Sequence, residues 1–194
     1  MRSKVITSII LISSLIGIWQ LSVAGTFYGK AMLAEQLIEQ AWQKTLAGET
    51  QVKPWPWADT WPVAKLSMPR LGIEQIVLAG DSGRVLAFGP GFTEGSALPG
   101  TAGLSVISGH RDTSFHFLED VQVGDRFSIQ NKQTIQTFKI VALEIVDQKD
   151  YRIDLTKFDE SESSVILVTC FPFDMLAGGD QRLLVLATSE ETEI

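Results

Sequence analysis

SVILVT, the stretch Ser164–Thr169 that runs directly into Cys170, decides how the rest of this 194-residue chain is interpreted. Its middle residues, Val165–Val168, are apolar and mostly β-branched, which predicts a buried strand. Pro172 lacks a backbone N–H and restricts Phe171 to extended geometry, so the strand should end close to Phe171. We therefore expect Cys170, the only cysteine of the chain, at a strand end, where its side chain can face a cleft.

The composition favours one ordinary domain with an appendage. Hydrophobic residues make up 45% of the chain, and the formal net charge is -7 without a cluster of lysine and arginine. Binding nucleic-acid phosphates requires a concentrated basic face, so we predict no nucleic-acid partner.

The N-terminus predicts export. Two basic residues precede an uncharged, Ile- and Leu-rich run, Val5–Gly29, which is long enough to span a bilayer. A signal peptide cleaved after the small residues Ser22–Ala24 is one interpretation. We favour a signal anchor over residues 1–29, with its basic end in the cytoplasm, because the uncharged run continues beyond Ala24 through two aromatic residues.

Export changes the meaning of Cys170. A lone cysteine is usually a small buried hydrophobe. Exported proteins, however, tend to pair their cysteines as disulfides. A single thiol in such a chain suggests an intermolecular bridge or a reactive nucleophile.

The remaining chain divides into three segments. Residues 30–48 form a predicted juxtamembrane helix, with apolar residues at helical spacing over Lys30–Leu46. Residues 49–62 are rich in proline and tryptophan and form a predicted linker. Residues 63–194 form the main domain.

This domain carries a pattern of short strands separated by turns rich in glycine and proline. The expected strands are Ala64–Met68, Ile73–Leu78, Val85–Phe88, Leu104–Ile107, Arg126–Gln130, Thr134–Val146, Val165–Val168 and Leu183–Ala187. Helix is scarce, with one turn expected around His116–Val121. The pattern is typical of an all-β closed barrel or sandwich.

A cysteine nucleophile needs a base or cation, because the thiolate is the attacking species. His110 follows the predicted strand Leu104–Ile107 and should lie at a strand end, as Cys170 does. His116 is expected to pack or to lie at the surface. Arg182 opens the last strand. Its short distance along the chain allows this strand to form a hairpin beside the Cys170 strand, where Arg182 would bind an oxyanion. The alternative is a surface salt bridge with Asp174 or Asp180.

The order His, Cys, Arg excludes some cysteine enzymes. Papain-like proteases place the cysteine first, and the residues around Cys170 do not fit a caspase. In the L,D-transpeptidases the histidine and cysteine are close together in a Ser-His-Gly-Cys motif, whereas His110 and Cys170 are far apart.

The chain resembles the sortases, which are membrane-anchored cysteine transpeptidases. Their signature Thr-Leu-x-Thr-Cys is similar to Ile166–Cys170, with a core-facing isoleucine expected in place of the first threonine. Ser108–Asp112 resembles the histidine region of the family, and Gln181–Leu183 resembles its arginine strand. The resemblance covers about Leu66–Ala187, and Thr169–Asp174 looks most like the sortases of Gram-negative bacteria.

The resemblance implies a closed eight-stranded β-barrel and a set of roles. Cys170 would attack the threonine carbonyl of a Leu-Pro-x-Thr-Gly-like (LPXTG-like) sorting signal and form a thioacyl intermediate. His110 would act as general acid and then as base, and Arg182 would hold the substrate backbone and stabilise the oxyanion. Thr169 is a candidate substrate-binding residue. We predict no cofactor and no metal, since acidic loops of the kind that bind calcium in some sortases are usually only solvated.

The implied partners are a substrate protein with a C-terminal sorting signal, an amine acceptor in the envelope and, through the N-terminal helix, the membrane. The implied location is the cytoplasmic (inner) membrane, with the catalytic domain on its periplasmic side. Two alternatives stay open: a non-catalytic exported β-domain that scaffolds an envelope protein, and a different cell-wall cysteine hydrolase.

Overall fold

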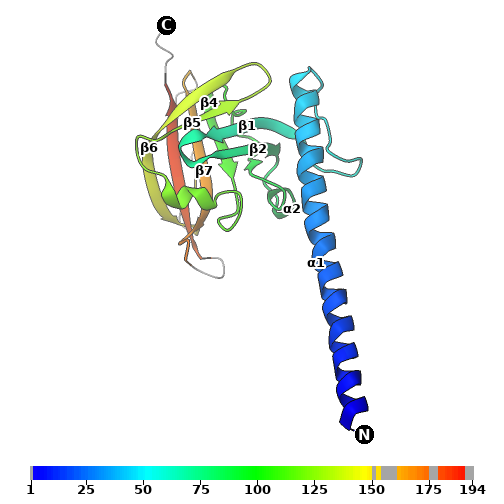
Figure 1. Ribbon diagram of the computed structural model, residues 1–194. Helices are drawn as coiled ribbons and strands as arrows, with labels where there is room; N and C mark the ends of the chain where they lie inside the picture. Colours follow the sequence, from blue (N-terminus) through cyan, green and yellow to red (C-terminus); the bar gives the residue numbers. More distant parts are fainter. Residues whose placement is uncertain (1, 150–151, 154–160, 175–178, 191–194) are drawn as a thin grey trace. The chain divides into compact units, whose positions relative to one another are not determined.

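The computed structural model describes residues 2–149, 152–153, 161–174 and 179–190 and divides into two compact units, Met1–Leu37 and Ile38–Ile194. Figure 1 shows the long helix α1 (Arg2–Leu46) and a barrel of strands. The sequence predicts separate anchor and juxtamembrane helices, but α1 is continuous. Nothing in the sequence interrupts it, because it contains no proline and isolated glycines cost a helix only about 1 kcal/mol each.

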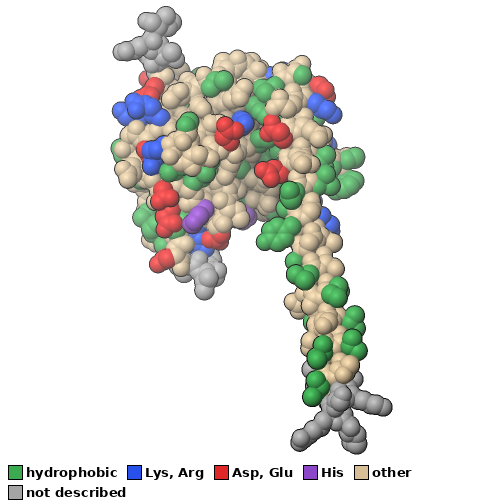
Figure 2. All heavy atoms as spheres, viewed as in Figure 1, with side chains coloured by type: hydrophobic (Ala, Val, Ile, Leu, Met, Phe, Trp, Pro, Cys, Tyr) green, Lys and Arg blue, Asp and Glu red, His purple; other side chains and the backbone are tan. Residues whose placement is uncertain are grey.

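The first unit is the apolar part of α1. Its large hydrophobic side chains are exposed, including Leu15, Trp19 and Leu21. Figure 2 shows hydrophobic side chains in green along the helix. The span Ile10–Leu46 contains a segment long and apolar enough to cross a membrane, a test of length and composition that a signal sequence also passes.

The second unit begins with the last turns of α1. Ile38, Ala41 and Trp42 are buried, and Ile38 packs with Leu78 and Val85 of the barrel unit. These turns are therefore part of the barrel's own packing.

The proline- and tryptophan-rich segment also packs on the barrel. The Trp55 ring meets the Phe88 ring edge-on, with centroids 5.0 Å apart, and the Thr60 hydroxyl donates to the Ala79 carbonyl oxygen at 2.7 Å. Trp57, by contrast, is 83% exposed. The segment is thus attached to the domain at its middle and near its C-terminal end.

Eight strands form a closed barrel in the order β1-β2-β3-β4-β7-β8-β6-β5, with β1 paired to β5. Among the strand pairs of the described residues, β2–β3 and β4–β7 are parallel and the others are antiparallel. The strands are β1 (Pro62–Met68), β2 (Ile73–Ala79), β3 (Gly91–Phe92), β4 (Gly103–Ser108), β5 (Arg126–Gln130), β6 (Ile135–Asp147), β7 (Ser163–Phe171) and β8 (Gln181–Ser189). The short helices are η1 (Pro69–Leu71), α2 (Gly83–Leu86) and η2 (His116–Asp120).

One expected strand is wrong. Val85–Phe88 is predicted as a strand, but the chain forms α2 there. The Ser82 side chain caps this helix by accepting a hydrogen bond from the Val85 N–H at 3.4 Å. The helical turn buries Val85, so the apolar residues of this segment are satisfied without a strand.

The strand that completes the sheet is β3, which pairs parallel with β2 and antiparallel with β4. A Cβ atom on Gly91 would lie 2.3 Å from the carbonyl oxygen of Gly80, so only glycine allows the two backbones to approach this closely. A strand of two residues has no alternating pattern, which is why the sequence did not predict it.

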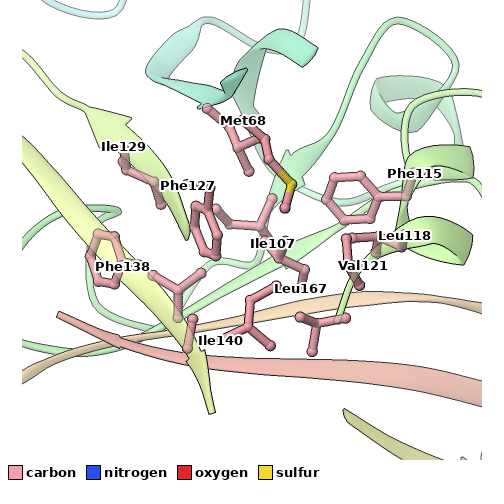
Figure 3. Close-up of a cluster of buried hydrophobic side chains, with 14 of the residues drawn as sticks. Met68, Ile107, Phe115, Leu118, Val121, Phe127, Ile129, Phe138, Ile140 and Leu167 are labelled. Carbon is pink, nitrogen blue, oxygen red and sulfur yellow. The ribbon is translucent and has the colours of Figure 1, made fainter. Parts of the chain in front are cut away.

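The barrel interior is a close-packed apolar core. Figure 3 shows side chains from several strands and from η2 converging there. Its largest fully buried members include Met68, Ile107, Phe115, Phe127, Phe138 and Leu167. A second cluster, formed by Leu104, Val106, Ile166 and Leu184, packs strands β4, β7 and β8 together outside this core. Ile166, the residue that departs from the sortase signature, is buried as expected, but in the second cluster and not in the barrel interior.

Candidate active site

The three predicted catalytic residues lie at the same end of three adjacent strands. β7 lies between β4 and β8 in the sheet. The register pairs Cys170 directly with Arg182. On the other side, the parallel register with β4 ends at the pair Ser108–Val168, so His110 and Cys170 each follow two residues later. The sheet therefore brings His110, Cys170 and Arg182 together, with the cysteine in the middle.

Two hydrogen bonds hold the ends of β4 and β7 together. The Gly109 N–H donates to the Val168 carbonyl oxygen at 3.0 Å, and the Thr169 hydroxyl donates to the Gly109 carbonyl oxygen at 2.8 Å. Thr169 is only 2% exposed, so its observed contact is structural. A direct contact between Thr169 and a substrate stays a prediction.

His110 is presented by a tight turn. Its carbonyl oxygen accepts hydrogen bonds from the N–H groups of Thr113, at 3.3 Å, and Phe115, at 2.9 Å. The preceding residue must be glycine, because a Cβ atom on Gly109 would lie 2.5 Å from the Phe115 ring. The buried phenyl ring thus fixes the backbone, while the imidazole side chain stays exposed.

Cys170 is a free, partly exposed thiol. Its place at a strand end agrees with the expectation from Pro172, since β7 ends at Phe171. Cys170 is thus accessible to a substrate while the backbone of its strand stays paired with β8.

Arg182 is held by the hairpin that connects it to Cys170. Its Nη1 donates to the carbonyl oxygens of Gly179 and Gln181, both at 2.8 Å, and its Nη2 donates to the Gln148 side chain. The guanidinium carries five N–H donors, and the contacts with described residues use three of them. In the part of the chain that the structure describes, Arg182 forms no ion pair with Asp180, which pairs instead with Lys149.

Arg111 is a site residue that the sequence analysis missed. It follows His110, yet it is only 4% exposed. Its Nη1 donates to the Pro172 carbonyl oxygen at 2.7 Å, and its Nε and Nη2 donate to the two carboxylate oxygens of Asp112 at 2.8 and 3.3 Å. No spacing in the sequence points to this role, because a charged residue after a strand is normally expected in solvent.

Charges are concentrated around this edge of the sheet. The hydrogen bond from Arg111 lowers the pKa of the Asp112 carboxyl, and the nearby histidines lower it further. The same bond, with smaller contributions from Cys170 and Asp174, raises the pKa of Arg111. Figure 2 shows histidine side chains at the surface of the barrel unit, with acidic and basic side chains beside them.

His116 is not on the strand ends that carry His110, Cys170 and Arg182. It begins η2, is exposed, and has its ring 6.3 Å from the ring of Phe173, measured between centroids. The expectation of a packing or surface role is confirmed. Among the described residues, no group of three or more His, Cys, Asp and Glu side chains is arranged to hold a metal ion.

Comparison with known proteins identifies the family. Residues 66–190, more than half of the chain, match the sortase domain. Sortase D of Bacillus subtilis (strain 168) is 30% identical over 120 residues. That match spans 62% of this chain and 60% of the relative, so it leaves a substantial part of the relative unmatched.

Solved structures show the same fold. The sortase D5 transpeptidase of Clostridium perfringens superposes with a TM-score of 0.59 at 23% identity, covering 79% of this chain and 89% of that one. Sortase A of Corynebacterium diphtheriae gives a TM-score of 0.61 at 24% identity, covering 82% and 85%. The closed eight-stranded barrel is thus confirmed, whereas the closer likeness to Gram-negative sortases stays a prediction. With its barrel, its signature and its matched domain, the chain belongs to the sortase family.

Proposed function

We propose that the protein is a membrane-anchored cysteine transpeptidase that cleaves an LPXTG-like sorting signal and transfers the acyl part to an amine. One observation carries the proposal: in a chain of the sortase family, Cys170 lies in register with Arg182 and beside the turn that presents His110. The three side chains supply a nucleophile, a proton carrier and an anion-binding group at one edge of the sheet.

The proposed first step is acylation. The Cys170 thiolate attacks the threonine carbonyl of the signal, and the negative charge that develops on oxygen accepts hydrogen bonds from Arg182. The C–N bond then breaks, and His110 donates a proton to the departing glycine amine. The products are a thioester on Cys170 and the released C-terminal peptide.

The proposed second step reverses the roles. An acceptor amine attacks the thioester carbonyl while His110 removes its proton. The C–S bond breaks, the thiolate leaves, and a new amide joins the substrate protein to the acceptor. Water can replace the amine and gives hydrolysis instead.

The location follows from the same proposal. The apolar part of α1 anchors the enzyme as a single span in the cytoplasmic membrane, with the barrel on the periplasmic side. Its partners are then a protein that carries a C-terminal sorting signal and an envelope amine. The exposed apolar side chains of the first unit support a membrane anchor.

Intact mass spectrometry tests the proposal. The full chain in detergent micelles is mixed with an LPXTG-containing peptide in the absence of an amine, with Cys170→Ala in parallel. The full chain is needed, because Ile38 and Trp42 at the end of α1 are buried in the barrel unit and a shortened protein that starts after Leu46 would lose them.

A mass increase equal to the acyl fragment is expected in the wild type and not in Cys170→Ala. If the protein ignores sorting peptides but cleaves peptidoglycan peptides, it is a different cell-wall hydrolase. If Cys170 also resists alkylation in the folded protein, the non-catalytic scaffold is the better description.

A further inference from the structure

Arg111 carries a buried charge that the proposed mechanism does not use. It is the only charged side chain that is fully buried among the residues the structure describes, at 4% exposed. Burying a guanidinium is costly unless its charge is paired and its donors are satisfied. Asp112 pairs with the charge of Arg111, and the Pro172 carbonyl oxygen accepts one of its N–H donors.

The described contacts of Arg111 connect two segments that are distant along the chain. Arg111 is bonded to its neighbour Asp112, and so to the turn that presents His110. It is also bonded to Pro172, 61 residues away and just after the Cys170 strand. One rigid, planar group therefore joins the two backbone segments that carry the proposed base and nucleophile.

A second bond completes the arrangement. The Thr169 hydroxyl contacts the Gly109 carbonyl oxygen at 2.8 Å, on the strand side of both reactive residues. The Arg111 bond to Pro172 lies on their loop side. His110 and Cys170 thus lie between hydrogen bonds that join the same two segments on both sides, and a shift of either segment would change the separation of their side chains.

We propose that Arg111 is a positioning residue for the transfer reaction, whose guanidinium sets the placement of His110 relative to Cys170. The inference rests on the proposed function of those two residues. Arg111 acts through them, because a side chain that is 4% exposed offers almost no surface to a substrate. Asp112 fixes the plane of the guanidinium through its two carboxylate contacts.

The first test separates catalysis from stability. Acylation of the full chain in micelles by the sorting peptide is measured for Arg111→Gln and Arg111→Lys, well below their melting temperatures. Positioning predicts that the acylation rate constant of Arg111→Gln falls at least about 10-fold while KM changes less than about 3-fold, since misplacement of reacting groups costs rate. Arg111→Lys retains the charge but not the two-pronged contact, so it should recover only part of the rate.

Arg70→Gln is the matched control. Arg70 also donates to a backbone carbonyl oxygen, that of Asp120, and to a carboxylate, that of Asp125, and within the described residues neither of these hydrogen bonds involves the Cys170 strand. Its acylation rate should stay within about 2-fold of the wild type. An equal fall of the acylation rate constant in the Arg70 and Arg111 variants, or a rise in KM without a fall of the rate constant, would overturn the proposal.

A second test does not depend on the peptide. Cys170 alkylation by iodoacetamide is measured for the wild type, His110→Ala, Arg111→Lys and the double variant, all in the folded state. If Arg111 places His110 beside the thiol, His110→Ala should slow alkylation at least about 5-fold when Arg111 is present. In the Arg111→Lys background, the same change should slow alkylation less than about 2-fold. The same factor in both backgrounds would refute the positioning role, even if no sorting peptide had yet been found. A wild-type protein that shows this coupling but forms no acyl adduct would instead count against the proposed reaction alone.

Discussion

The two halves of β7 differ in burial although they belong to one continuous strand. Ser163–Leu167 is buried throughout, with side chains in the barrel core on one face and in the second apolar cluster on the other. From Val168 onward the residues are partly exposed except for Thr169. The backbone stays paired with β8 through Phe171, so only the side-chain environment changes. Stability and chemistry should therefore be separable along a single strand.

The largest effect is expected on the chemical side of this comparison. His110→Asn removes the proposed general acid and base, so acyl transfer should slow by at least about 10²-fold. The melting temperature should hardly change, because the His110 side chain is exposed. Peptide turnover and thermal unfolding, measured on the same preparation, check both statements. A parallel loss of stability would break the comparison.

A change in the buried half should do the opposite. Leu167→Ala opens a cavity in the core, where Leu167 is 1% exposed, and should lower the free energy of unfolding by about 2–5 kcal/mol. Urea unfolding followed by tryptophan fluorescence measures this loss. The specific activity of the folded fraction should stay within about 2-fold of the wild type. The partly exposed neighbour Val168, changed to alanine, provides the control and should cost less.

Thr169 lies at the border between the two halves and sharpens the comparison. Thr169→Val leaves the Gly109 carbonyl oxygen without its hydroxyl donor and should cost about 1–3 kcal/mol of stability. Because this bond joins the His110 and Cys170 segments, activity should also fall, unlike in Leu167→Ala. Thr169→Ser keeps the donor and should retain most of both properties. If the serine variant is as impaired as the valine variant, the hydroxyl is not the important group.

The smallest effect is expected at the partly exposed ion pair between Arg126 and Glu190, with contacts of 2.7 and 2.8 Å. The hydrogen bond from Arg126 lowers the pKa of Glu190 below its ordinary value of 4.5. The pair therefore stabilises the fold above that pH, and this contribution disappears as the pH falls through the lowered pKa.

Glu190→Gln should thus be slightly less stable than the wild type at neutral pH and low salt. The difference should vanish in strong salt and in acid, because exposed ion pairs are weak and screened. Unfolding curves at two pH values and two salt concentrations test this expectation. A difference that grows in acid would contradict the assigned sign.

Local sequence signals predicted much of the site. The β-branched run before Cys170 and the proline after it predicted where β7 lies and where it ends. The short chain distance indicated that the Arg182 strand could form a hairpin with the Cys170 strand, and the register pairs the two residues directly. The long expected strand Thr134–Val146 is a single strand, β6, whose register with β8 shifts between Ile140 and Ala142, as a bent strand requires.

Two of the misses arise because burial and contacts with distant residues outweighed the local pattern. Val85–Phe88 has strand-forming residues, but a serine cap and burial of Val85 favour a helical turn. Arg111 has the composition of a solvated loop residue, and only a contact 61 residues away makes it a buried link. No window along the sequence contains both partners of such a contact.

The parallel pairing of β4 with β7 also has a consequence for folding. Cys170 and Arg182 belong to a hairpin, which forms from local contacts, whereas the bond from Thr169 to Gly109 closes a loop of 60 residues. Contacts between distant segments form slowly, because the chain must first lose the entropy of closing the loop. During folding, Cys170 should therefore come close to Arg182 before it comes close to His110. The active site would then be assembled among the last parts of the barrel. A chain that had not finished folding would be unable to form the thioester with its substrate.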